Sequence, residues 1–118
     1  SVFTPVGLFP AAVIGIDIRA LLEGACAMAN RCATAALEEN PAYLNAVIHY
    51  IFDTKKGKPL SVLMPYADCL LSVADWYRQL YAESLGKRET KDGREVFCGP
   101  TPIRALGVTD QHSQLQLY

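Results

Sequence analysis

Apolar residues recur every three or four positions along three segments, a spacing that predicts amphipathic helices. The first runs from Asp17 to about Ala36, and the Asp17 side chain is placed to cap its N-terminus. The second follows Asn40-Pro41, where proline suits a first helical turn, and ends in a run of lysines. The third spans residues 68–85, and Gly86 fits the C′ position just beyond its end.

Shorter apolar runs between these helices predict strands. Residues 60–64, closed by a proline, have the pattern of a strand buried on both faces, and residues 96–98 form a second candidate. Residues 1–4 favour extended structure, and a proline- and glycine-marked turn follows. The apolar stretch 11–16 after it fits either a helix or a buried strand. Helices alternating with buried strands predict one α/β domain over residues 1–118, a layered αβα arrangement with a mainly parallel sheet.

Two further segments are predicted as loops. Residues 87–95 are highly charged around an Asp-Gly turn, which indicates a solvated loop rather than a binding patch. Glycines and prolines interrupt residues 99–107, which indicates a structured loop. The segment from Thr109 opens with residues typical of a helix start, and the last residues continue it without a capping glycine.

The amino-acid composition argues against several classes of function. The sequence has 51% hydrophobic residues, as in globular proteins, and 11 basic against 12 acidic residues, so it lacks the basic surplus of nucleic-acid-binding proteins. The apolar opening is broken by prolines and is too short to span a membrane. The cysteines contain no CxxC pair, which disfavours a metal site and predicts buried free thiols in a reducing, cytosolic compartment. They are Cys26, Cys32, Cys69 and Cys98.

The candidate catalytic residues lie on the third predicted helix and near the C-terminus. Gln79 and Glu83 are four residues apart and therefore share a face, and a carboxylate in a partly apolar setting near a helix C-terminus suits a general base. His112 is expected in the first turn of a helix, where the dipole favours a neutral imidazole. Taken alone, each pattern fits a surface or capping residue better than a catalytic one. His49, in mid-helix and without a set of polar neighbours, is interpreted as structural.

Three segments occur in the order found in one enzyme family. Ser1-Val2-Phe3-Thr4-Pro5-Val6-Gly7 is similar to the second half of a family signature. Ala82-Glu83-Ser84-Leu85-Gly86-Lys87 is similar to its Glu-Ser-x-Gly-Lys segment, and Gly107-Val108-Thr109-Asp110-Gln111-His112 to its Gly-x-x-x-Gln-His segment. The sequence thus resembles the glucose-6-phosphate isomerases (phosphoglucose isomerases) of the bacterial kind, over nearly its whole length.

The resemblance implies a sugar-isomerase (SIS) fold and a cytosolic enzyme of glycolysis and gluconeogenesis. It would interconvert glucose 6-phosphate and fructose 6-phosphate through an enediol, with no metal or organic cofactor. Glu83 would carry the proton between C1 and C2, His112 would assist ring opening, and Gln79 would contact substrate. The parent protein is expected to be a homodimer in which His112 reaches the neighbouring subunit's site.

The resemblance also implies that the chain is an internal part of a longer protein. The family's enediolate-stabilising arginine belongs to the run just before Ser1, and its phosphate-binding loop and C-terminal lysine lie outside these residues. The isolated chain is therefore expected to be inactive. Two alternatives remain open: a non-catalytic sugar-phosphate-binding module of the same fold, and the isomerase part of a fused transaldolase and isomerase.

Overall fold

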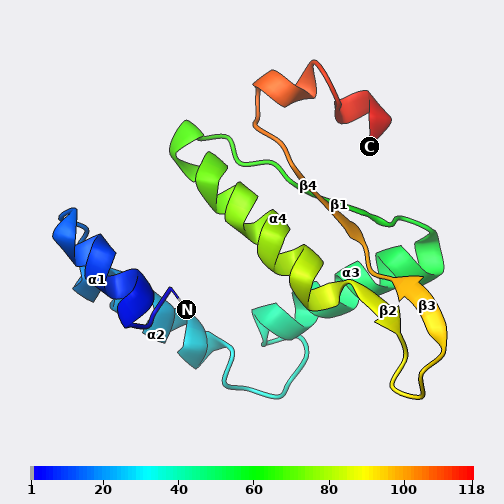
Figure 1. Cartoon of the computed structure of the whole chain (residues 1–118), viewed down its shortest axis with the longest axis horizontal. Helices are drawn as coiled ribbons and strands as arrows, with labels where there is room; N and C mark the ends of the chain where they lie inside the picture. Colours follow the sequence, from blue (N-terminus) through cyan, green and yellow to red (C-terminus); the bar gives the residue numbers. More distant parts are fainter. Residues whose placement is uncertain (1) are drawn as a thin grey trace. The chain divides into compact units, whose positions relative to one another are not determined.

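The structure is a computed structural model that describes residues 2–118, so the prediction for the first residue lies outside the described part. The chain forms two compact units, the first ending at Val47 and the second spanning Ile48–Tyr118 (Figure 1). The α/β class is confirmed, since helices accompany a parallel pair of strands. That residues 1–118 are one domain of a longer chain stays a prediction.

The first unit is helical. It contains α1 (Pro5–Val13), α2 (Ile18–Arg31) and the start of α3 (Pro41–Lys56). The predicted N-cap of α2 is confirmed, because Oδ1 of Asp17 accepts hydrogen bonds from the amides of Arg19 and Ala20 at 3.0 Å each. The amide groups at a helix start have no partner within the helix, and the cap supplies one.

Three expectations for the first unit are wrong. The turn predicted over the early prolines is instead α1, which begins at Pro5 and contains Gly7 and Pro10. Residues 2–4 form a turn and a bend rather than extended structure. The third difference is the length of α2, which ends at Arg31 rather than near residue 36.

The second unit continues from α3 into the strands and the last long helix. Its elements are β1 (Leu60–Leu63), η1 (Asp68–Leu70), α4 (Leu71–Leu85), β2 (Lys87–Glu89), β3 (Glu95–Cys98), β4 (Thr101–Arg104), η2 (Thr109–Gln111) and η3 (Leu115–Leu117). The predicted helix over residues 68–85 is thus present, with a 3₁₀ turn at its start. Both predicted strands are also present.

The strands form two pairs. β1 and β4 are parallel, with Leu60 opposite Thr101 and Leu63 opposite Arg104, whereas β2 and β3 form an antiparallel hairpin. The loops predicted over 87–95 and 99–107 are therefore wrong in part, since each contains a strand. The predicted Asp-Gly turn is present between β2 and β3, where Gly93 has a φ of 83°. That positive φ explains why a glycine occupies the turn.

The core of the described residues is small. Ala74 on α4 and Ala105 after β4 are its buried apolar side chains, and α4 packs against β4 and β1. The prediction that β1 is buried on both faces is wrong, because Leu60 and Leu63 are 43% and 37% exposed. β1 has β4 as its one neighbour in the described sheet.

Two local expectations also differ from the structure. The cysteines are free, but Cys32 is half-buried and the others are exposed, so they are not the buried thiols predicted. Gly86 ends α4 with a φ of −65° rather than in the left-handed region. A Cβ there would lie 2.8 Å from the carbonyl oxygen of Ala82, so close approach of backbone explains the glycine. Within residues 2–118, no helix has the length and apolarity needed to cross a membrane.

Candidate active site

The last two turns of α4 carry the first pair of candidate residues. Gln79 Nε2 donates a hydrogen bond to Glu83 Oε1 at 3.4 Å. The prediction that the two side chains share one face is confirmed by this contact, as expected for residues four apart on a helix. The amide thus holds one carboxylate oxygen and leaves the other accessible.

The surroundings of Glu83 differ from those expected. The side chain is exposed rather than set against an apolar surface. It does lie two residues before the end of α4, near the negative end of the helix dipole. Among residues 2–118 it forms no ion pair, and its nearest basic neighbour in sequence, Lys87, donates from Nζ to the carbonyl of Ser84 at 2.8 Å. Glu83 is therefore presented outward, open to a ligand.

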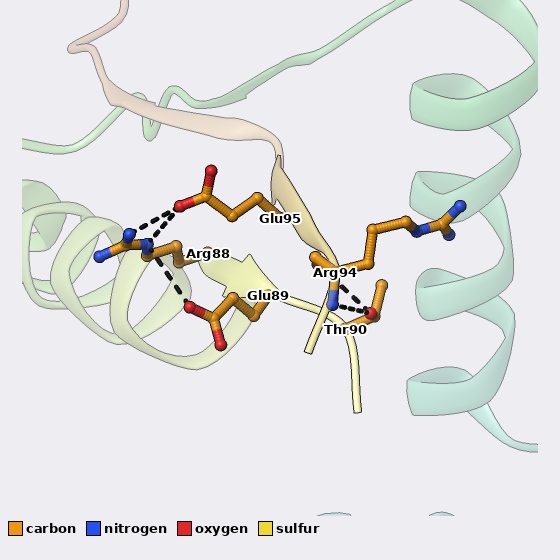
Figure 2. Close-up of polar contacts among 5 residues, drawn as sticks. All are labelled: Arg88, Glu89, Thr90, Arg94 and Glu95. Carbon is orange, nitrogen blue, oxygen red and sulfur yellow. Dashed lines mark hydrogen bonds and ion pairs between the residues drawn. The ribbon is translucent and has the colours of Figure 1, made fainter. Parts of the chain in front are cut away.

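The β2–β3 hairpin follows directly from the end of α4. Figure 2 shows Arg88 pointing toward Glu95, with Nη2 2.6 Å from Oε1, and a longer contact of 3.6 Å to Glu89. On the other side of the hairpin, Thr90 Oγ1 accepts from the amide of Arg94 at 3.1 Å. Such exposed ion pairs stabilise a fold by about 0–1 kcal/mol each, so they contribute little to the stability of the hairpin.

His112 lies in a different local structure from the one predicted. It follows the 3₁₀ turn η2, and its amide donates back to the carbonyl of Thr109 at 3.4 Å. His112 follows this single 3₁₀ turn instead of lying in the first turn of a helix, so the helix-start dipole expected beside the imidazole is absent. The imidazole is exposed.

The backbone around His112 is held by contacts to the loop after β1. The side-chain amide of Gln111 donates to the hydroxyl of Tyr66, and the amide of Gly107 donates to the carbonyl of Pro65 at 2.9 Å. A Cβ on Gly107 would lie 2.7–2.8 Å from the Tyr66 ring, so glycine permits this close approach. These contacts fix the turn that carries His112 at the carboxyl ends of β1 and β4.

The C-terminal end of α4, which carries Glu83, and the segment after β4, which carries His112, lie at opposite ends of the second unit. In Figure 1, α4 lies along the β1–β4 pair, its C-terminal end is beside β2, and the orange segment after β4 is at the other end. The hydrogen bond between Tyr66 and Gln111 supports this separation. Tyr66 lies just before η1, at the start of α4, and Gln111 is the neighbour of His112 in sequence. The structure therefore joins Gln79 to Glu83 and separates both from His112 within one chain.

Sequence reasoning missed the surroundings of His49. Its Nδ1 lies 3.0 Å from the Tyr81 hydroxyl and 3.5 Å from Ser61 Oγ. The interpretation of His49 as lacking polar neighbours is therefore wrong. No local signal marks this group, because Tyr81 is 32 residues away in sequence. In the described residues, no cluster of three or more His, Cys, Asp or Glu side chains could hold a metal ion.

Comparison with known proteins identifies the family. A sequence model described as phosphoglucose isomerase matches residues 1–118. The chain belongs to the phosphoglucose isomerase family. A glucose-6-phosphate isomerase of Carboxydothermus hydrogenoformans is 60% identical over the whole chain, and one of Methanocaldococcus jannaschii is 48% identical over the same length.

A solved structure has the same fold as this member of the phosphoglucose isomerase family. The hypothetical protein TT0462 from Thermus thermophilus is 40% identical, with a TM-score of 0.80 over 97% of this chain and 26% of that one. The chain spans about a quarter of the length of the curated relatives it matches. The family membership is thus established over the whole chain, whereas the activity belongs to longer proteins.

Proposed function

We propose that residues 1–118 are the part of a glucose-6-phosphate isomerase that supplies its general base and its ring-opening histidine. The observation that carries the proposal is the match of the entire chain to the phosphoglucose isomerase family, with relatives named glucose-6-phosphate isomerase at up to 60% identity. The full-length protein would be a cytosolic enzyme of glycolysis and gluconeogenesis, and the sugar phosphate would be its substrate.

Glu83 is the proposed general base. Its carboxylate removes the proton from C2 of the open-chain aldose. The C–H electrons form the C1–C2 double bond, and the π electrons of the C1 carbonyl move onto O1, which takes up a proton to give an enediol. As the ketose forms, the O2 hydroxyl loses a proton and becomes the carbonyl, the C1–C2 double bond opens, and the carboxylic acid returns its proton to C1. The reaction redistributes hydrogen within one sugar, so it consumes no oxidant or reductant. The accessible carboxylate oxygen and the hydrogen bond from Gln79 support this role, since a base must reach its proton within hydrogen-bond distance.

Gln79 is the proposed substrate contact and His112 the proposed ring-opening residue. The amide of Gln79 can orient the carboxylate of Glu83 and bond a sugar hydroxyl on the same face of α4. His112 would move a proton between the ring oxygen and the C1 hydroxyl of the closed sugar. Its exposure at the turn after η2 supports this role, since the imidazole is open to a ligand.

Replacing Glu83 by Gln in the full-length protein tests the base. The substitution keeps the shape of the side chain and removes its basicity, so kcat should fall by about 10² to 10⁴-fold, the range for one general acid–base group. Isomerase activity is read by coupled oxidation of glucose 6-phosphate, and circular dichroism checks the fold. A nearly normal kcat in Glu83→Gln would refute the assignment. The isolated 118 residues should be inactive, because within residues 2–118 Glu83 forms no ion pair with a cation that could also stabilise an enediolate.

A homodimer that exchanges His112 between subunits is part of the proposal. The separation of Glu83 from His112 within one chain supports it. Full-length Glu83→Gln and His112→Ala proteins, each impaired alone, should regain activity when they are mixed under conditions that exchange subunits. Each mixed dimer would contain one site with an intact Glu83 from one subunit and an intact His112 from the other. If His112 served its own chain, both sites of the mixed dimer would stay defective and no activity would return.

A further inference from the structure

Three polar side chains from three elements meet on the inner side of the second unit. His49 comes from α3, Ser61 from β1 and Tyr81 from α4. The Tyr81 hydroxyl lies 3.0 Å from His49 Nδ1, and Ser61 Oγ lies 3.5 Å from the same nitrogen. Each atom can donate or accept, so the three side chains can satisfy one another.

This group is partly shielded from water. Ser61 is 7% exposed, and His49 and Tyr81 are half-buried. Burial raises the pKa of Tyr81 above 10.0, against the opposing effect of the Ser61 hydrogen bond. The Tyr81 ring also lies against the Tyr77 ring, with centroids 5.1 Å apart. Burial makes the hydrogen bond costly to break, because an unpaired polar group would remain behind.

The position of Tyr81 on α4 connects this group to Glu83. At about 100° per residue, Tyr81 lies on the side of the helix nearly opposite the face shared by Gln79 and Glu83. The hydroxyl of Tyr81 thus anchors the inner side of the last turns to β1 and α3. The outer side carries the carboxylate. Rotation of the helix about its axis, which would swing Glu83 sideways, is opposed by the Tyr81 anchor.

We propose that the hydrogen-bonded group of His49, Ser61 and Tyr81 positions the Glu83 carboxylate for proton transfer. The inference rests on the proposed function, in which Glu83 is the base. Tyr81 and His49 are positioning residues, since they act through α4 and not on the sugar. Misplacement of a reacting group by about 1 Å can cost about 10²-fold in rate, so a modest rotation of the last turn is enough to matter.

The test compares two hydroxyl deletions in the full-length protein. Tyr81→Phe removes the anchoring hydroxyl and keeps the ring, and Tyr77→Phe is the matched control, because within residues 2–118 the Tyr77 hydroxyl forms no hydrogen bond. Tyr81→Phe should lower kcat about tenfold with KM within about twofold, whereas Tyr77→Phe should keep both within about twofold. Equal kcat values in the two variants, or a change confined to KM, would overturn the proposal.

Rescue at His49 adds a second comparison. His49→Asn keeps a polar atom close to the position of Nδ1 and should retain most of the kcat, whereas His49→Leu should lower kcat as much as Tyr81→Phe does. A double variant, His49→Leu with Tyr81→Phe, should lose no more than either single variant, because both remove one contact. Additive losses would show that the residues act separately and would overturn the proposal.

Amide hydrogen exchange separates failure of this inference from failure of the proposed function. Exchange at residues 81–85 reports the order of the last turn of α4 and does not depend on any reaction. It should be about tenfold faster in Tyr81→Phe than in Tyr77→Phe, as expected for loss of one hydrogen bond of about 1–1.5 kcal/mol. Unchanged exchange would refute the anchoring itself. If exchange is faster in Tyr81→Phe but the full-length wild-type protein has no isomerase activity, the proposed function alone would be refuted.

Discussion

Asn40 is a buried polar side chain that links the end of α2 to the start of α3. It is 1% exposed and uses its amide group completely. Nδ2 donates to the carbonyls of Cys32 and Thr34 at 3.0 and 2.8 Å. Oδ1 accepts from the amides of Ala42 and Tyr43 at 3.0 and 3.1 Å. One side chain therefore caps α3 and also fastens the chain that leaves α2.

The cost of Asn40→Ala follows from these four bonds. Loss of an N-cap costs about 1 kcal/mol, within a range of about 0.5–2. Each of the two Nδ2 bonds contributes about 1 kcal/mol net, and the carbonyls they leave behind are only partly open to water. The sum is about 3 kcal/mol, which corresponds to a change on the order of 10² in the equilibrium for opening the first turn of α3.

Amide hydrogen exchange in the full-length protein measures this opening. In Asn40→Ala, the amides of Ala42, Tyr43 and Leu44 should exchange on the order of 10² times faster than in the wild type. The matched control is Asn45→Ala on the exposed surface of α3, where alanine has the better helix propensity and exchange should stay the same or slow. An effect of less than about tenfold in Asn40→Ala, or one equal to the control, would refute the reasoning.

Two further predictions concern the second unit. Gly107→Ala should destabilise the full-length protein by about 1–3 kcal/mol, because its Cβ would overlap the Tyr66 ring, while Gly24→Ala, with open space around it, should be neutral or stabilising in thermal unfolding. The pKa of Tyr81 is raised by burial, so the folded state keeps its proton at a pH where the unfolded chain has lost it. The contribution of the Tyr81 hydroxyl to the free energy of unfolding is complete below about pH 10 and declines above it. Measured by urea unfolding, this decline with pH should be shallower in Tyr81→Phe than in the wild type. Identical declines in the two proteins would contradict the prediction.

The helices were predictable where a local residue sets each boundary. Asp17 accepts the first amides of α2, and proline at the start of α3 needs no amide partner. α1 was missed because its prolines and glycine resemble a turn. Pro5 begins the helix, where proline is favoured, but Pro10 lies inside it. Local chemistry therefore predicted the capped helices and failed where proline is tolerated within a helix.

β4 was missed because its stability comes from a distant segment. Its residues include Pro102, and proline normally argues against a strand. In the structure, Pro102 lies opposite Ser61, and β4 has β1 as its one neighbour in the described sheet, so the missing amide costs the pair little. The His49–Tyr81 contact was missed for the same reason, since no pattern within either helix indicates the partner.

The candidate residues were recognisable as motifs, but their relative placement was not. Gln79 and Glu83 form the contact that a spacing of four predicts, whereas His112 is placed by non-local contacts such as the one between Tyr66 and Gln111. Glu83 lies about 18 Å along α4 from Leu71, at a rise of about 1.5 Å per residue, and the turn that carries His112 is tied to the loop before that end. An acid–base group must approach its substrate to about 3 Å, so two residues at opposite ends of one βαβ unit are poorly placed to serve the same hexose. The proposed homodimer would assemble such a site from two copies of the chain, which is why subunit mixing is a sharper test of His112 than its substitution alone.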